Sequence, residues 1–295
     1  MFPTSLSPSR SSDFLQCPLL YRFRTIDQLK EEPSRAAIQG TLVHKVLENI
    51  FELPSGDRTV AEAGRIFEEE LTQLHHINPE EFMVITGGQS PVEDISQYIR
   101  KALEPVVPLL DTYFAMEDPN RLEPFAREMA LSVEISTDFS IRGFIDRVDK
   151  SPQGDIRVVD YKTGRSPGDR YADKAMFQMR FYALAWWRIT GEIPHTLQIM
   201  YLGDGKFLRY QPEASDLIAT EKRILSIRSA IERSAELELF VPSPSKLCNW
   251  CSFKAICPAF EGTPPDLPEK HLWTSGSSLV ENALKSALTV SDEQP

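Results

Sequence analysis

Cysteine is scarce in this chain, and long apolar runs are missing. Four of the 295 residues are cysteines, and in a reducing cytosol they are poor candidates for disulfides. No run of about 18 apolar residues occurs, which excludes a membrane-spanning helix. The first ten residues, MFPTSLSPSR, lack the charged start and the apolar stretch of a secretory signal. We therefore expect a cytoplasmic protein with no membrane partner.

Internal repeats and the phosphate-binding motif G-x4-G-K-[ST] are also absent. The missing motif excludes a helicase motor on this chain. Hydrophobic residues make up 41% of the sequence, which is enough for the core of one large domain or two small ones.

Basic residues are outnumbered, and the net charge is −11. The imbalance is uneven, because residues 52–138 hold 18 acidic and 6 basic side chains, a local net of −12. Residues 142–188 hold 10 basic and 6 acidic side chains, a local net of +4. The total charge argues against a nucleic-acid partner, whereas the basic segment allows one. On charge alone, the acidic and the basic segment are equally well explained as solvent-exposed faces that bind nothing.

Hydrophobic periodicity and turn residues divide the chain into helices and strands. A helix is expected from Pro8, with Ser7 as its N-cap, to Cys17. Residues 35–52 form a second helix, and an acidic, mostly helical segment follows to about residue 116. Three strands at 125–135, 139–150 and 154–164 form an antiparallel meander. The rest predicts a helix at 172–191, strands at 195–203 and 206–212, and a helix at 215–237. The fold class is therefore α/β, a mixed central sheet flanked by helices.

Two charges stand at the end of an otherwise buried strand, in the stretch IRVVDYKTG. Alternation places Asp160 and Lys162 on one face of this strand and Tyr161 on the other. Asp146, on the preceding strand, can converge with Asp160. Two close carboxylates repel each other unless a cation lies between them, and oxygen ligands favour Mg²⁺ or Mn²⁺. Beside such a metal, Lys162 can orient a water and offset charge on an attacked phosphate. A simple ion pair between Asp160 and Lys162 is the alternative.

Three polar residues on helices add to this pattern. Gln178 and Tyr182 are four residues apart and share one face of an apolar helix. His44 lies among Leu42, Val43 and Val46, which favour burial. Each also has a purely structural explanation, as a core tyrosine, an exposed glutamine or a buried histidine.

The cysteines are split between the two ends of the chain, at Cys17, Cys248, Cys251 and Cys257. Four thiols that include a C-x2-C pair are more typical of a metal site than of disulfides. Zinc and iron–sulfur are both compatible with four thiolates.

The ordered motifs resemble the RecB-like branch of the PD-(D/E)XK nucleases, and within it the iron–sulfur subgroup. The residues that carry this resemblance are GTLVH at 40–44, GFID at 143–146, DYKTG at 160–164, and Gln178 with Tyr182. Each motif is short, but the set in this order is specific. The resemblance implies one nuclease domain over residues 1–260, with a helical acidic insertion at 52–120. It leaves 261–295 as an expected flexible tail, with a short helix near 280–288.

The resemblance also implies roles for individual residues. Asp146, Asp160, His44 and the carbonyl of Tyr161 would bind the catalytic metal, and Lys162 would activate water. Gln178 and Tyr182 would line the site, and Glu128 lies on a neighbouring strand without a motif match. Cys17 would join Cys248, Cys251 and Cys257 around a structural 4Fe–4S cluster, so that residues 241–260 close onto Cys17.

The expected function is a metal-dependent exonuclease that acts on DNA, mainly single-stranded, in repair or recombination. A helicase or repair protein is a possible partner. Two alternatives remain at this stage: an inactive relative that binds DNA or a partner, and a zinc-stabilised protein that is not a nuclease.

Overall fold

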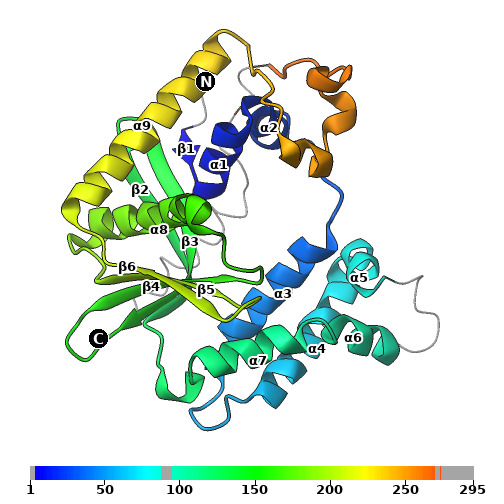
Figure 1. Cartoon of the computed structure of the whole chain (residues 1–295), viewed down its shortest axis with the longest axis vertical. Coiled ribbons are helices and arrows are strands. Elements are labelled where there is room, and N and C mark those ends of the chain that lie inside the picture. The colour runs from blue at the N-terminus through cyan, green and yellow to red at the C-terminus, as the bar shows by residue number, and fades with distance from the viewer. Residues whose placement is uncertain (1–3, 88–94, 270–272, 274–295) are drawn as a thin grey trace.

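The computed structural model has a mixed sheet at its centre and helices on both faces (Figure 1). It describes residues 4–87, 95–269 and Trp273. The strands are β1 (Ser5–Leu6), β2 (Ala126–Ser136), β3 (Phe139–Lys150), β4 (Ile156–Lys162), β5 (Thr196–Tyr201) and β6 (Lys206–Tyr210). The helices are α1 (Pro8–Gln16), α2 (Pro18–Tyr21), α3 (Arg35–Asn49), α4 (Val60–Ile77), α5 (Pro79–Thr86), α6 (Ile95–Leu103), α7 (Val107–Met116), α8 (Asp169–Thr190) and α9 (Ala214–Glu236). Among the described helices, none combines the length and apolar character that a membrane crossing requires.

The expected α/β class and antiparallel meander are confirmed. β2, β3 and β4 pair antiparallel in sequence, and α8 then crosses over to β5, which runs parallel to β4. The predicted helix ends are also present, since the Ser7 hydroxyl accepts the Arg10 amide and α8 stops at Gly191, whose φ is 79°. Glycine suits this left-handed position because it has no Cβ.

One edge of β3 is shared by two strands that do not meet. β1 pairs in parallel with Ser140 and Ile141, whereas β4 pairs antiparallel with β3 from Arg147 to Lys150. Residues 142–146 have no strand partner on this edge, while β2 covers the other one. The sheet is therefore open along this stretch. β1 was missed in the sequence because two residues are too short to show a period.

β4 is buried on both faces, which explains its nearly continuous apolar sequence. Ile156 and Val158 belong to the core that includes α8 and α9. Val159 and Tyr161 belong to a second core, built with α3 to α7. Asp160 is consequently a polar residue within a buried strand, and it is 1% exposed.

The acidic segment covers the second face of the sheet (Figure 1). Its helices α4 to α7 bury an apolar stripe against α3, including Phe67, Leu71, Phe82 and Ile85. The acidic side chains are mostly on the outside of these helices. Residues 88–94 of this segment lie outside the described residues. The segment is thus part of the packing that buries Val159 and Tyr161.

The C-terminal part packs against the N-terminal helices (Figure 1). It consists of short 3₁₀ turns at Lys246–Trp250, Lys254–Ile256 and Pro258–Phe260. Phe253, which is 5% exposed, contacts Phe23 of the N-terminal region. Beyond residue 269 Trp273 alone is described, so most of the expected flexible tail, including its predicted short helix at 280–288, lies outside the described residues.

Candidate active site

Asp146 lies where β3 and β4 separate. The last paired residues are Arg147 and Val159. Beyond this pair, the Asp146 side chain replaces the backbone of β3 as the hydrogen-bond acceptor for β4. Its Oδ2 accepts the Tyr161 amide at 2.7 Å. The same oxygen is 3.5 Å from His44 Nδ1 on α3, and His44 Nε2 is 3.0 Å from the Tyr161 carbonyl oxygen. Asp146, His44 and the Tyr161 backbone therefore form one connected unit.

Glu128 faces Asp146 from the neighbouring strand β2. The pairs Arg127–Arg147 and Met129–Ile145 bracket these two residues, which places them opposite each other. Like charges in this position are destabilising without a compensating group. Glu128 also has a φ of 43°, a left-handed conformation that is uncommon for a residue with a side chain. Ligand atoms of His44, Glu128 and Asp146 all lie within 4.8 Å of one another.

Lys162 and Asp160 form a second unit beside the first. Lys162 Nζ lies 2.8 Å from Asp160 Oδ2 and 3.3 Å from Gln178 Oε1. The Gln178 amide donates to Asp160 Oδ1 at 2.8 Å and is 3.1 Å from Tyr182 Oη. One turn of α8 thus holds both the amine and the carboxylate of β4 in place.

Burial and charge shift the pKa values of these groups. Burial raises the pKa of Asp160 to about 6, with Lys162 opposing the shift and Asp146 adding to it. Burial and the charge of Asp146 raise the pKa of Glu128 to about 7. For Lys162, burial lowers the pKa, but the Asp160 carboxylate outweighs it, so the net pKa is raised and the amine is charged at neutral pH.

The pKa of His44 is set by the same two opposing effects as that of Lys162, burial and nearby carboxylates. Burial lowers the pKa of His44, while its contact with Asp146 and the charges of Asp146 and Asp160 raise it, and the result is a raised pKa. Without a metal, the site therefore gathers carboxyl groups that resist ionisation and one imidazole that favours protonation. A divalent cation would reverse both tendencies, since bound carboxylates and imidazoles lose their protons.

The donor set fits a hard divalent cation. Three of the candidate ligands are carboxylates and one is an imidazole, a mixture that suits Mg²⁺ or Mn²⁺. Asp160 Oδ2 is buried, and the Lys162 amine, 2.8 Å away, is its ion-pair partner. An oxygen with a free lone pair at this depth is available for coordination.

The structure places the predicted metal and catalytic residues in two groups, one around Asp146 and one around Lys162. His44 and Asp146 are in the compact ligand group, and the Tyr161 carbonyl adjoins it. Asp160 is outside that group because its oxygens contact Lys162 and Gln178. Glu128 occupies the third position instead. The register of the predicted meander could have identified Glu128, because it places the residue opposite Asp146.

Arg147 supports the site from the other face of the sheet and was missed in the sequence. It is 1% exposed, and it donates to the Tyr161 hydroxyl at 2.6 Å and to Glu117 Oε2 at 3.0 Å. Since Tyr161 separates Asp160 from Lys162, holding its ring fixes the strand that carries both. An arginine inside a strand is normally solvent-exposed, and the sequence gives no signal that this one is buried.

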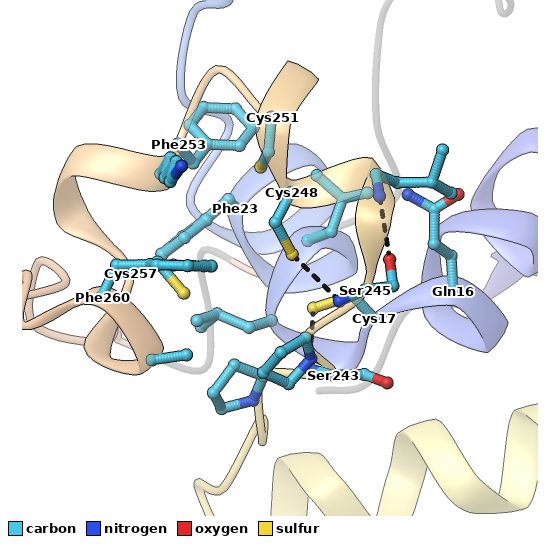
Figure 2. Close-up of a pocket in the computed structure, with 17 residues that line it drawn as sticks. Gln16, Cys17, Phe23, Ser243, Ser245, Cys248, Cys251, Phe253, Cys257 and Phe260 are labelled. Atoms are coloured by element: carbon cyan, nitrogen blue, oxygen red, sulfur yellow. Dashed lines mark hydrogen bonds between the residues drawn. The ribbon is translucent and has the colours of Figure 1, made fainter.

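The four cysteines line one cavity at the junction of the chain's two ends (Figure 2). All four thiols are free. The Ser243 amide donates to Cys17 Sγ at 3.4 Å, and the Ser245 amide donates to Cys248 Sγ at 3.3 Å. Phe23, Phe253 and Phe260 line the same cavity. We refer to residues 241–262 as the cysteine lobe.

Burial raises the pKa of the Cys251 thiol, and neighbouring Cys248, Cys17 and Cys257 raise it further. Four thiolates could share this space only with a cation among them. The thiol set therefore fits a metal or a metal cluster.

Comparison with known proteins assigns the fold to a family. The sequence matches the PD-(D/E)XK nuclease superfamily over residues 5–258. The chain belongs to this superfamily. Asp146, Asp160 and Lys162 lie within the matched range, as do all four cysteines.

Relatives of this PD-(D/E)XK protein include a phage protein and a helicase-associated protein. The Gene 69 protein of Mycobacterium phage D29 is 28% identical over 273 residues, which cover 86% of this chain and 97% of that protein. One subunit of an ATP-dependent helicase/deoxyribonuclease from Streptococcus mutans is 26% identical over 171 residues, 57% of this chain and 15% of that protein. A crystal structure from Eubacterium rectale, of a protein provisionally named an exonuclease, has a TM-score of 0.53 at 16% identity. It covers 91% of this chain and 92% of its own, and shows the shared fold.

Proposed function

We propose that this PD-(D/E)XK protein is a divalent-metal-dependent deoxyribonuclease of the RecB-like branch. In this proposal it removes nucleotides from the ends of single-stranded DNA during repair or recombination. One observation carries the proposal. A compact ligand group of His44, Glu128 and Asp146 lies beside the charged, partly buried amine of Lys162, at the opening between β3 and β4.

The ligand group would hold Mg²⁺ or Mn²⁺. His44, Asp146 and Glu128 supply side-chain ligands, and Asp160 and the Tyr161 carbonyl complete the set. Such a metal polarises a phosphate oxygen and makes a bound water easier to deprotonate. Arg147 and α8 keep these ligands in place from opposite faces of the sheet.

Lys162 would act as a hydrogen-bond donor and a fixed positive charge. Its raised pKa keeps it protonated, so it does not serve as the general base. It can orient the attacking water and offset the negative charge that develops on the phosphate. Gln178 and Asp160 aim the amine, and Tyr182 contacts Gln178.

The size of a cavity supports the preference for single-stranded DNA, and the names of relatives support action at DNA ends. A cavity of about 440 Å³ runs along the open edge of β3 to Asp146, Gln178 and Tyr182. This volume is that of a small-ligand pocket and suits a single nucleotide strand better than a duplex. The names of the Eubacterium rectale and Streptococcus mutans relatives agree with exonuclease and deoxyribonuclease activity.

The test is a DNA degradation assay with linear and circular substrates. We expect linear single-stranded DNA to be degraded with Mg²⁺ or Mn²⁺, circular single-stranded DNA to be spared, and a chelator to stop the reaction. Lys162→Ala should abolish degradation. The matched control is Lys30→Ala, which removes an amine that is 80% exposed and paired with Glu80.

Three results would contradict parts of the proposal. Equal degradation by wild type and Lys162→Ala would reject the assigned site. Rapid cleavage of circular DNA would reject the exonuclease assignment. A wild-type protein that binds DNA but never degrades it would favour the inactive relative.

We also propose that Cys17, Cys248, Cys251 and Cys257 bind a structural 4Fe–4S cluster. Tetrahedral zinc with Zn–S bonds of about 2.3 Å places its sulfurs about 3.8 Å apart. Among the described residues, no three cysteine sulfurs lie within 4.8 Å of one another, since His44, Glu128 and Asp146 form the one group that does. A cluster of several irons is larger than one ion and suits thiolates at wider spacing.

The colour of the purified protein distinguishes these metals. A brown solution with a broad visible band and about four irons per chain supports the cluster. A colourless protein with stoichiometric zinc would replace it with a zinc site. We further propose that a helicase or repair protein is a partner in the cytoplasm, since one relative is a subunit of an ATP-dependent helicase/deoxyribonuclease.

A further inference from the structure

Two arginines without acidic partners share the cavity that leads to the site. Arg10 lies on α1 and Arg142 lies on the open stretch of β3, and both line the cavity with Asp146, Gln178 and Tyr182. Within the described part of the chain, neither guanidinium forms an ion pair at 4.0 Å or less. Many other arginines do, including buried Arg22 and Arg147. Exposed arginines such as Arg35 and Arg233 also lack an ion pair among the described residues, but Arg10 and Arg142 are partly buried.

The two guanidiniums are also poorly satisfied by hydrogen bonds. Arg142 Nε is buried and has no hydrogen-bond partner among the residues that the structure describes. Arg10 Nη1 has a single long contact, 3.4 Å to the Ser5 hydroxyl. Burying charges without partners is unfavourable, so this pair is destabilising until an anion binds it.

The charge of one arginine acts on the other, as expected for two neighbouring groups. Burial lowers the pKa of Arg10, Tyr21 opposes this, and the charge of Arg142 lowers the pKa further. Arg10 stays charged at physiological pH, because an arginine remains protonated even when its pKa falls. The repulsion is therefore permanent in the free protein.

The surroundings provide further donors suited to phosphate oxygens. The hydroxyls of Ser7, Ser9 and Ser12 line the same cavity. Arginine's planar fork of N–H groups matches a phosphate in two-point contact. Arg142 and Asp146 are four residues apart on one strand, roughly 13 Å by the rise of a strand, so one DNA strand can reach both.

We propose that Arg10 and Arg142 grip a backbone phosphate of the DNA strand, on the β1 side of the phosphate that is hydrolysed. This proposal rests on the nuclease function above and adds the residues that hold the substrate. The grip would lie outside the metal site. Its loss should weaken DNA binding and raise KM more than it lowers kcat.

Binding is measured in a Lys162→Ala background, so that hydrolysis does not intervene. Fluorescence anisotropy with a labelled oligo-dT strand follows Kd over a series of salt concentrations. We expect the double variant that carries both Arg10→Gln and Arg142→Gln to raise the Kd for the oligonucleotide at least tenfold. The slope of log K against log salt should fall by about 0.7, the contribution of one phosphate on a single strand. Arg233→Gln, which removes one exposed charge from α9, is the control and should change neither quantity.

Stability in the absence of DNA separates a binding role from a structural one. Because the free arginines repel each other, the double variant should keep or raise its Tm, by roughly 2 °C. The substitutions Arg10→Lys and Arg142→Lys keep the charge and should preserve the salt slope while losing part of the affinity. A lower Tm with unchanged DNA affinity and salt slope would show that the arginines are structural and overturn the proposal.

A position-specific test identifies the contacted phosphate. Neutral methylphosphonate linkages are placed one at a time along the strand. At one position, the methylphosphonate should weaken DNA binding by the Lys162→Ala parent. At the same position, it should not further weaken DNA binding by the variant that also carries Arg10→Gln and Arg142→Gln. If every position affects both proteins equally, no single phosphate is gripped and the proposal fails. Both binding tests remain informative if the protein never cleaves DNA, so failure of the nuclease assignment is recognised separately.

Discussion

The candidate metal centre and the cysteine lobe differ in how each is held together. Around the metal centre, the ligands sit on long elements with their own buried core, and protein groups such as Arg147 and Gln178 fix them. In the cysteine lobe, three short 3₁₀ turns bury none of their own residues. Its organisation depends on contacts with α1 and α2 and on the thiols. Under the proposed function, the first site is therefore built before a metal binds, whereas the second would be completed by the metal that it binds.

The largest expected effect is the loss of activity in Asp146→Asn. An asparagine oxygen can still accept the Tyr161 amide, so the fold is retained while the charged ligand is lost. Degradation of DNA should fall about a thousandfold, and Mn²⁺ binding measured by calorimetry should be lost. The Tm without metal should be the same or higher, because Glu128 no longer faces a second carboxylate.

Asp146→Ala is the informative counterpart of Asp146→Asn. It leaves the Tyr161 amide without its acceptor, which costs about 1–3 kcal/mol. If Asn and Ala destabilise the protein equally, the metal centre is not preorganised by this hydrogen bond, and the contrast with the cysteine lobe is wrong.

The next effect is a loss of stability in Cys248→Ser. A link between Cys17 and the cysteine lobe closes a loop of more than 200 residues, and such cross-links contribute about 3–5 kcal/mol. The visible absorbance should disappear and the Tm should fall by roughly 10 °C. Ser252→Ala, at an exposed position in the same lobe, should change neither. An unchanged Tm after loss of the metal would show that the lobe is stable by itself.

Glu128→Gln should have an effect of intermediate size. It should raise the stability of the metal-free protein and weaken metal binding. The pKa of Glu128 is raised from 4.5 to about 7, so ionising it destabilises the folded state as pH rises through that range. At pH 8 without metal, the variant should be more stable than wild type by about 1 kcal/mol, after allowance for solvent screening. Below pH 4.5 the two should be equally stable.

Thermal unfolding in a chelator at pH 4.5 and pH 8 measures this difference, and Mn²⁺ titration measures the affinity. The affinity should fall about tenfold or more, as expected for loss of a ligand. A variant that binds Mn²⁺ as tightly as wild type would remove Glu128 from the ligand set.

The smallest effect is expected for Tyr182→Phe. The hydroxyl contacts Gln178, which still donates to Asp160 after the change. Loss of one such hydrogen bond should slow degradation about threefold to tenfold, with a Tm shift within roughly 1 °C. A hundredfold slower reaction would place the hydroxyl in the chemical step.

Local patterns in the sequence were sufficient for most elements. The Ser7 cap, Gly191 and the alternation in β3 and β4 each specify one conformation, and they predicted the correct helices and strands. The pairing of Asp160 with Lys162 followed from alternation alone. Placing Asp146 near Asp160 required that their two strands be neighbours in the sheet. The short turn before β4 made this pairing predictable.

Features that depend on distant segments were not predictable in this way. β1 is two residues long, and its place beside β3 depends on the whole sheet. Burial of Arg147 depends on Glu117 and Tyr113 of the acidic segment. The left-handed backbone of Glu128 has no local sign, since neither glycine nor asparagine marks it.

The helix α1 connects two places that have so far been treated apart. It begins at the wall of the cavity that holds Arg10 and Arg142 and ends at Cys17, a span of nine residues, roughly 14 Å. A rigid rod of this length transmits a displacement at one end to the other. Under the proposed function, oxidative damage around Cys17 should therefore weaken DNA binding before it affects the candidate metal site, so substrate retention is the first property that such damage would impair.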